Sequence, residues 1–270
     1  GLSTESGIPD YRGHAGSYWK NHQPIRHDQF ISRHKKRQRY WGRSLFGWRD
    51  FDEKQPNRGH VALARLQESD RLGVKTAMGR RIGIITQNVD RLHSKAGSKN
   101  VLELHGRTNQ LVCMSCGHLS DRRDFQTQLE ADNDKWIREQ QERLQEEGTS
   151  SRPDGDAAIE TSFDSLRLPS CNACGTGVLK PNVVFFGDTV PRDRVQACRQ
   201  AVEASDGVLV IGSSLSVHSA WRHVKAALDA NISVAVLNVG PTRADGKDGV
   251  VQLHAPAGPV LEAVAMELAR

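Results

Sequence analysis

The fold of this chain follows from the stretch Ile84-Ile85-Thr86-Gln87-Asn88-Val89-Asp90-Arg91-Leu92-His93. Its first residues are β-branched, so they predict the end of a short buried strand over residues 81–86. Amide, carboxylate and imidazole side chains follow that strand directly. Open α/β sheets bind ligands at the carboxyl ends of their strands. The stretch therefore predicts a strand that delivers polar groups to a ligand pocket.

The last third of the chain repeats this arrangement. Strands and helices are expected to alternate over residues 207–212, 218–230, 233–238 and 258–270, and another helix is expected over 58–70. This order predicts an α/β fold with a parallel sheet and helices on its faces. The turns Gly212-Ser213-Ser214 and Asn238-Val239-Gly240 each follow a strand and expose small-residue amides suited to ribose and phosphate.

The composition limits the class of protein. The 270 residues are 37% hydrophobic and 26% charged, which is enough for a packed core. No apolar run approaches the ~18 to 20 residues that cross a bilayer, so no membrane partner is expected. The net charge is +5, and basic residues gather between positions 20 and 49. A solvated helix face explains them better than a nucleic-acid patch, so nucleic acid is not an expected partner.

Residues 1–13 are rich in Gly and Ser and carry Arg12. Exposed backbone amides and a guanidinium could form a phosphate cradle. An ordinary Gly/Pro loop is the alternative, and both stay open because the segment has no G-x-G-x-x-G motif. Residues 14–57 interleave aromatic and basic residues, which predicts short helices in a region that covers a cofactor.

Four of the five cysteines form two C-x-x-C pairs, each followed by Gly. Thiolates on two such tight turns can complete a tetrahedral zinc shell. Because four sulfurs leave no open position, the zinc ion would be structural and could not activate water. A redox pair is the alternative, but two matched pairs favour zinc. The predicted ligands are Cys113, Cys116, Cys171 and Cys174, and Cys198 is expected in the core.

A charged segment separates the two cysteine pairs. Residues 122–147 place apolar side chains at roughly helical spacing, which predicts an exposed amphipathic helical insertion. A linker rich in Gly, Ser and Asp is expected to follow over 148–156.

Further motifs accompany the cysteine pairs. They are Ser6-Gly7-Ile8-Pro9-Asp10-Tyr11-Arg12, Thr86-Gln87-Asn88-Val89-Asp90, Leu104-His105-Gly106, Val183-Val184-Phe185-Phe186-Gly187-Asp188, Gly212-Ser213-Ser214-Leu215 and Leu237-Asn238-Val239-Gly240. In this order, over almost the whole chain, they resemble the signatures of the sirtuins, which are NAD-dependent protein lysine deacylases. Tyr11, where most sirtuins carry Phe, and Pro153-Asp154-Gly155-Asp156 are similar to the class II branch.

The resemblance implies two domains with an acyl-lysine peptide held between them. A Rossmann-like NAD-binding domain would span 1–104 and 181–270 and include the cofactor-covering segment 14–57. A small zinc-ribbon domain would span 105–180 and carry the insertion 122–156. The family's first strand, with the Gly-Ala that should precede Gly1, is expected to be missing from this sequence.

The resemblance also implies a reaction. In sirtuins the acyl oxygen attacks C1′ of the nicotinamide ribose, nicotinamide leaves and an alkylimidate forms. His105 would then act as general base on the ribose hydroxyls, a role that suits an imidazole with an ordinary pKa of about 6.5. O-acyl-ADP-ribose and free lysine would be released. The residues implied in catalysis are His105, Asn88 and Asp90.

The cofactors implied are NAD, as co-substrate, and one structural Zn²⁺. Asp90 would accept from the nicotinamide carboxamide and Gln87 would hold the ribose. The residues implied in NAD binding are Gly1, Ser6, Gly7, Ile8, Pro9, Asp10, Tyr11, Arg12, Gln87, Asn88, Val89, Asp90, Gly212, Ser213, Ser214, Asn238, Val239, Gly240 and Ala257. Val184, Phe185 and Gly187 would supply backbone bonds to an extended substrate peptide.

Tyr40 and Arg43 have the Y-x-x-R spacing that a related sirtuin branch uses to bind acyl carboxylates. A phenol and a planar guanidinium can pair an anionic acyl group, so a preference for bulky or acidic acyls is expected. The alternative is a surface Tyr and Arg on a basic helix.

The expected function is NAD-dependent removal of acyl groups from lysines of partner proteins. Mono-ADP-ribosylation of protein at the same pocket is the second hypothesis, and a non-catalytic NAD sensor is the third. His105 favours deacylation, because simple ribosyl transfer does not need the imidate step. The resemblance implies a mitochondrial matrix protein, or a cytoplasmic one if the source is bacterial, and no targeting peptide is visible.

Overall fold

The computed structural model describes residues 1–11, 24–77, 79, 81–147, 155–157, 159 and 161–268. Arg12, the start of the segment 14–57 and most of the linker 148–156 lie outside the described residues. The chain divides into two compact units. The first unit comprises Gly1–Ser17, Lys54–His105 and Val190–Arg270, and the second comprises Tyr18–Glu53 and Gly106–Thr189.

Parallel strands form the centre of the first unit. A three-stranded sheet has the order β10-β9-β8, built from β8 (Gly207–Ile211), β9 (Ser233–Leu237) and β10 (Val250–Leu253). Both of its strand pairs are parallel, and Ala235 lies between Leu209 and Val251. A second parallel pair joins β3 (Ile85–Thr86) to β4 (Leu102–Glu103), and an antiparallel pair joins β1 (Val74–Lys75) to β2 (Arg81–Ile82).

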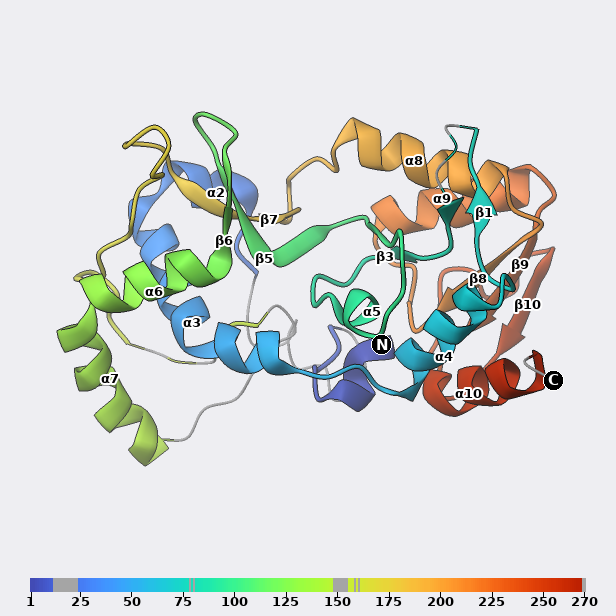
Figure 1. Cartoon of the computed structure of the whole chain (residues 1–270), viewed down its shortest axis with the longest axis horizontal. Coiled ribbons are helices and arrows are strands. Elements are labelled where there is room, and N and C mark those ends of the chain that lie inside the picture. The colour runs from blue at the N-terminus through green and yellow to red at the C-terminus, as the bar shows by residue number, and fades with distance from the viewer. Residues whose placement is uncertain are drawn as a thin grey trace. The chain divides into compact units, whose positions relative to one another are not determined.

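Helices cover both faces of the three-stranded sheet because successive side chains point to opposite faces. Val210, Val234 and Val236 pack with residues of α8 (Arg192–Glu203) and α9 (His218–Asp229). Leu237 and Ile211 instead pack with α4 (Arg58–Glu68), α10 (Ala257–Leu268) and Leu2 of the 3₁₀ helix η1 (Leu2–Ser6). In Figure 1, α8 lies alongside α9, and α4 alongside α10. The predicted α/β fold with helices on both faces of a parallel sheet is confirmed.

The second unit contains an antiparallel sheet that the sequence reasoning did not predict. Its order is β6-β5-β7, with β5 (Gly106–Cys113) between β6 (Leu119–Asp121) and β7 (Leu179–Val183) (Figure 1). Its helices are α2 (His27–Ser32), α3 (His34–Glu53), α6 (Arg122–Asp132) and α7 (Asp134–Glu147). The segment predicted to form short helices therefore contains the 20-residue helix α3.

The predicted helical insertion forms two helices, α6 and α7. They are separated at Asn133, whose side-chain amide donates to the carbonyls of Leu129 and Arg167. These bonds compete with continuation of the helix, as short polar side chains commonly do. Of the helices in the described part of the chain, none combines the length and apolar character that a membrane crossing needs.

The grouping of the chain differs from the predicted domain division, which placed 14–57 with the NAD-binding domain. Arg122 of α6 explains why Tyr18–Glu53 belongs to the second unit. Arg122 is 1% exposed, and its guanidinium carbon lies 5.2 Å from the ring centroid of Trp41 and 4.6 Å from that of Trp48, both on α3. Burial lowers the pKa of Arg122 to about 10. Cation–π contacts of this kind are strongest when desolvated, so they hold α3 on the insertion.

Candidate functional site

The polar stretch after β3 is tied to the N-terminal segment through Ser3. The Ser3 hydroxyl donates to Asp90 Oδ2 over 2.6 Å and accepts from the side-chain amide of Asn88 over 3.0 Å. Asp90 Oδ1 accepts from the Leu92 amide over 2.9 Å, at the start of α5 (Leu92–Lys95). Ser3 and Asp90 are both buried. The structure thus brings Asn88 and Asp90 together, and it adds Ser3, which the sequence reasoning did not name.

Gln87 links the carboxyl ends of β3 and β8. Its side-chain amide donates to Ser213 Oγ over 2.9 Å, and the same oxygen accepts from the Leu215 amide over 3.2 Å. Gly212 has φ +58°, and a Cβ there would lie 2.6 Å from the Leu2 nitrogen. Only glycine permits this approach of Gly1 and Leu2 to the turn after β8. The turn predicted to hold part of NAD therefore contacts the predicted phosphate segment.

His105 follows β4 and has a partner at each ring nitrogen. Nδ1 lies 3.2 Å from the Gln87 carbonyl oxygen, and Nε2 lies 2.8 Å from Ser219 Oγ. Burial lowers the pKa of His105, the bond to Gln87 raises it, and the positive charges of Arg194 and Arg222 lower it further. The imidazole is therefore a neutral base near pH 7, as general-base chemistry requires.

The remaining residues predicted for NAD lie in the first unit, apart from Arg12, which lies outside the described residues. Ser6 Oγ accepts from Asn57 over 3.1 Å, and Ser214 Oγ lies 3.0 Å from Ser216 Oγ. The Asn238 side-chain amide donates to the Gly240 carbonyl over 2.6 Å, which shapes the turn after β9. The others lie in the loop after η1, in the turns after β3 and β9, and at the first position of α10: Gly7, Ile8, Pro9, Asp10, Tyr11, Val89, Val239 and Ala257. Val239 is 67% exposed.

The four predicted zinc ligands meet in the second unit. Their sulfurs all lie within 4.8 Å of one another, and the Cys113–Cys174 and Cys116–Cys171 sulfur pairs are each 3.8 Å apart. A tetrahedron with Zn–S bonds of about 2.3 Å requires sulfurs about 3.8 Å apart. The cluster therefore has the dimensions of a structural zinc site, and no disulfide joins these cysteines.

Each cysteine pair forms a tight turn that leaves its sulfurs on one side. The Gly117 amide donates to the Cys113 carbonyl and the Gly175 amide to the Cys171 carbonyl. Both glycines have positive φ, which explains the Gly that follows each pair. The amides of Cys116 and Ser115 donate to Cys113 Sγ, and they lower the pKa of that thiol to about 6.

Gly177 belongs to the cysteine site, although the sequence reasoning missed it. A Cβ at this position would lie 2.2 Å from Cys113 Sγ and 2.9 Å from Cys174 Sγ. Its carbonyl accepts from the Cys171 amide over 3.0 Å. The only sequence signal is a second glycine soon after the second pair, and the need for it depends on Cys113, far away in the sequence.

The residues predicted to bind a substrate peptide form a turn after β7. The Asp188 amide donates to the Phe185 carbonyl, and Gly187 has φ +79°. Asp188 Oδ2 lies 3.1 Å from both the buried Lys180 ammonium and His27 Nδ1. The His27 amide also donates to the Phe186 carbonyl over 2.9 Å. These contacts hold the turn that contains Val184, Phe185 and Gly187.

Tyr40 and Arg43 are buried in α3 instead of lying on its surface. The ring of Tyr40 packs 5.3 Å from that of Phe185, which is one of the predicted peptide-binding residues. Arg43 donates through Nε and Nη2 to the Ile159 carbonyl, each over 3.3 Å. The edge of the guanidinium that carries Nε and Nη2, one of the two edges that can pair a carboxylate, is thus directed at a backbone oxygen.

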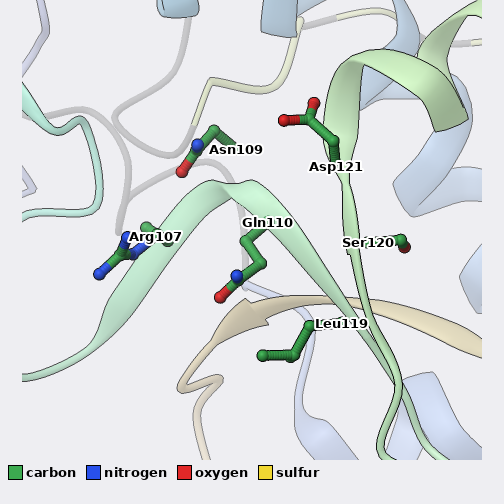
Figure 2. Close-up of a pocket in the computed structure, with 6 residues that line it drawn as sticks. All are labelled: Arg107, Asn109, Gln110, Leu119, Ser120 and Asp121. Carbon is green, nitrogen blue, oxygen red and sulfur yellow. The ribbon is translucent and has the colours of Figure 1, made fainter.

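A polar hollow of about 210 Å³ lies on the hairpin of β5 and β6. Figure 2 shows its lining side chains, which are Arg107, Asn109, Gln110, Leu119, Ser120 and Asp121. None of them was predicted as a site residue. The predicted catalytic and NAD-binding residues belong to the first unit and the predicted peptide-binding residues to the turn after β7.

Comparison with known proteins identifies the family. Residues 1–219 match the model described as the Sir2 family. NAD-dependent protein deacetylase 2 of Bradyrhizobium diazoefficiens is 45% identical over 246 residues, which cover 91% of this chain and 83% of that protein. NAD-dependent protein deacetylase of Xanthomonas campestris is 46% identical over 246 residues, which cover 91% of this chain and 78% of that protein. NAD-dependent protein deacylase Sirt4 of Drosophila melanogaster is 44% identical over 248 residues, which cover 91% of this chain and 74% of that protein.

A solved structure gives the same answer. The structure described as "Sir2-p53 peptide-NAD+" is 26% identical to this chain and has a TM-score of 0.72, with 99% of this chain and 90% of that one covered. The family model, the relatives and the fold agree with one another and with the motifs. The chain belongs to the Sir2 family, the sirtuins.

Proposed function

We propose that this protein is an NAD-dependent protein lysine deacylase. The observation that supports it best is the half-buried imidazole of His105, which is neutral near pH 7 and belongs to the same unit as the Asn88–Ser3–Asp90 cluster. The relatives named above as deacetylases and deacylases support the same activity.

The residues of the first unit fit NAD. Among the described residues each oxygen of Asp90 accepts one hydrogen bond and keeps a lone pair for a carboxamide N–H, and Gly212 leaves its turn without a side chain. Bound NAD would supply an activated glycosidic bond at C1′. His105 would take a proton at Nε2 from a ribose hydroxyl, while Gln87 would hold the ribose and Asp90 the nicotinamide carboxamide.

The four cysteines would hold one Zn²⁺ as a structural ion. The sulfur spacing fits tetrahedral zinc, and four thiolates leave no position for water or substrate. The zinc would stabilise the second unit and take no part in the reaction.

We further propose acylated-lysine proteins as substrates, with the peptide bound as an extended strand by Val184, Phe185 and Gly187. An acidic or bulky acyl group would contact Tyr40 and Arg43. Because Arg43 already donates to the Ile159 carbonyl through Nε and Nη2, an acyl group that paired with this edge of the guanidinium would have to displace that bond. Tyr40→Phe and Arg43→Met together should reduce activity on acidic acyls more than on acetyl, and an unchanged acyl ranking would contradict this.

Mass spectrometry of acyl-lysine peptides incubated with NAD and the zinc-loaded protein tests the proposed function. Loss of the acyl mass with matching O-acyl-ADP-ribose is the expected result. His105→Gln should lower the rate at least about 100-fold, whereas His254→Gln, at an exposed position, should not. Transfer of ADP-ribose to a protein without any deacylation would contradict the proposal and favour the transferase alternative.

For the location we propose the cytoplasm of a bacterium, because two of the three relatives described above are bacterial. The resemblance to mitochondrial sirtuins has no such support. Localisation of the tagged protein in its source organism would test this.

A further inference from the structure

Ser219 contacts the catalytic imidazole, although it is 114 residues away in the sequence. It lies in the first turn of α9, directly after the loop that follows β8. Its Oγ is 2.8 Å from His105 Nε2, the ring nitrogen that would take the proton. The opposite nitrogen, Nδ1, is 3.2 Å from the Gln87 carbonyl oxygen.

The Gln87 carbonyl determines which nitrogen carries the proton. A carbonyl oxygen can only accept, so Nδ1 must carry a hydrogen and donate to it. In the neutral ring Nε2 is then bare and accepts, so the Ser219 hydroxyl must donate. A hydroxyl can also rotate and accept. Once Nε2 has taken a proton, Ser219 can accept from it without any movement of the backbone.

The surroundings of His105 make such a partner important. The charged groups that act on the ring are Arg194 from α8 and Arg222 from α9, and both oppose its protonation. Arg222 lies three residues after Ser219, on the same face of the helix. Its Nε and Nη2 are buried and have no hydrogen-bond partner among the described residues, so no acceptor offsets its charge there. An imidazolium at this position needs an acceptor for each of its N–H groups.

We propose that Ser219 is a positioning residue for His105, whose hydroxyl donates to Nε2 in the resting enzyme and accepts from Nε2 after the ring has taken a proton. Gln87 and Ser219 together then give the ring two partners in both protonation states. The single lone pair of Nε2 cannot accept from Ser219 and take a ribose proton together, so the Ser219 hydroxyl turns away from Nε2 as the ribose hydroxyl transfers its proton and accepts from the Nε2–H afterwards. Its role rests on the proposed use of His105 as general base.

Removal of the hydroxyl has a predictable direction. A hydrogen bond to a charged partner is roughly twice as strong as one between neutral groups. Ser219 therefore stabilises the protonated ring more than the neutral ring. In Ser219→Ala the pKa of His105 should fall by about half a unit to one unit, and kcat should fall roughly threefold to tenfold.

NMR titration of the His105 ring in the zinc-loaded, ligand-free protein tests the proposal without relying on activity. The pKa should be lower in Ser219→Ala, restored in Ser219→Thr, and unchanged in Ser233→Ala, which removes an exposed hydroxyl at the start of β9. An unchanged or raised pKa in Ser219→Ala would overturn the proposal, whether or not the protein deacylates peptides.

Kinetics add a second readout. The acidic limb of kcat/KM should move to lower pH in Ser219→Ala, with kcat reduced and the KM for peptide unchanged. A purely structural role would not move that limb. If the titration shows the expected shift but no variant or parent deacylates any peptide, the proposed function fails and the His105–Ser219 contact stands.

Discussion

Replacement of His60 by Gln should make the stability of the protein less sensitive to mild acid. His60 is fully buried on α4, and its ring lies 4.9 Å from that of His93. Burial, with a smaller contribution from His93, lowers the pKa of His60 to about 3. In the unfolded chain the pKa returns to about 6.5.

The size of the effect follows from proton binding in the two states. Between pH 3 and 6.5 the unfolded chain binds a proton at this position and the folded chain does not, so stability falls as pH decreases. From pH 7.5 to pH 5.5, with these two pKa values, His60 alone lowers the free energy of unfolding by about 1.4 kcal/mol. In the folded protein His60 Nδ1 accepts a hydrogen bond from the backbone amide of Asn57. A glutamine does not titrate, and its side-chain oxygen can accept that hydrogen bond instead.

Urea denaturation at pH 7.5 and 5.5, followed by circular dichroism on zinc-loaded protein, measures this difference. The loss of stability between the two pH values should be smaller in His60→Gln than in the parent by about 1.4 kcal/mol. His254→Gln, at an exposed position, is the matched control and should lose as much as the parent. The comparison of two pH values within each variant cancels any constant destabilisation. If His60→Gln and the parent lose the same amount, the buried neutral histidine is not the cause.

Three further predictions follow from contacts in the two units. Gly177→Ala should reduce zinc content strongly, because the new Cβ would lie 2.2 Å from Cys113 Sγ. Gly175→Ala places its Cβ in open space, so this variant should keep zinc and lose only about 1 kcal/mol of stability to backbone strain. Equal zinc content in the two variants by atomic absorption would contradict this. Lys180→Met removes the buried partner of Asp188 in the turn after β7. It should destabilise the protein by about 1 to 3 kcal/mol and raise the KM for peptide. An unchanged KM would count against the proposed role of this turn in peptide binding. Ser3→Ala leaves Asp90 Oδ2 without its donor and should lower the free energy of unfolding by about 1 to 3 kcal/mol, and an unchanged urea midpoint would refute this.

The parts of the site that sequence predicted well are those where the decisive residues are close together in the chain. Two cysteines and a glycine within five residues define one zinc-binding turn, because φ and hydrogen bonds within the turn decide where the sulfurs point. The polar residues after β3 are a second example. They follow the strand directly in the sequence, so they must lie at its carboxyl end. Alternating apolar runs predicted the strands and helices of the first unit for the same reason.

Contacts with distant partners could not be predicted from local spacing. The spacing of Tyr40 and Arg43 gives no sign that α3 is buried against the insertion, or that the Ile159 carbonyl accepts from Arg43. Local sequence also gives no sign that α3 belongs to the same compact unit as the cysteines, because Trp41 and Trp48 pack on Arg122, some 80 residues later.

The sequence by itself determined the family motifs, the cysteines that cluster at the candidate zinc site and the histidine proposed as general base, since each depends on residue types at short spacing. Only the tertiary structure decided that Ser219 meets His105, that Ser3 joins Asn88 to Asp90, and that Gly177 must lack a side chain. The physical reason is that short spacing fixes which side chains share a turn or strand end, whereas contacts between distant segments depend on how whole helices and strands pack.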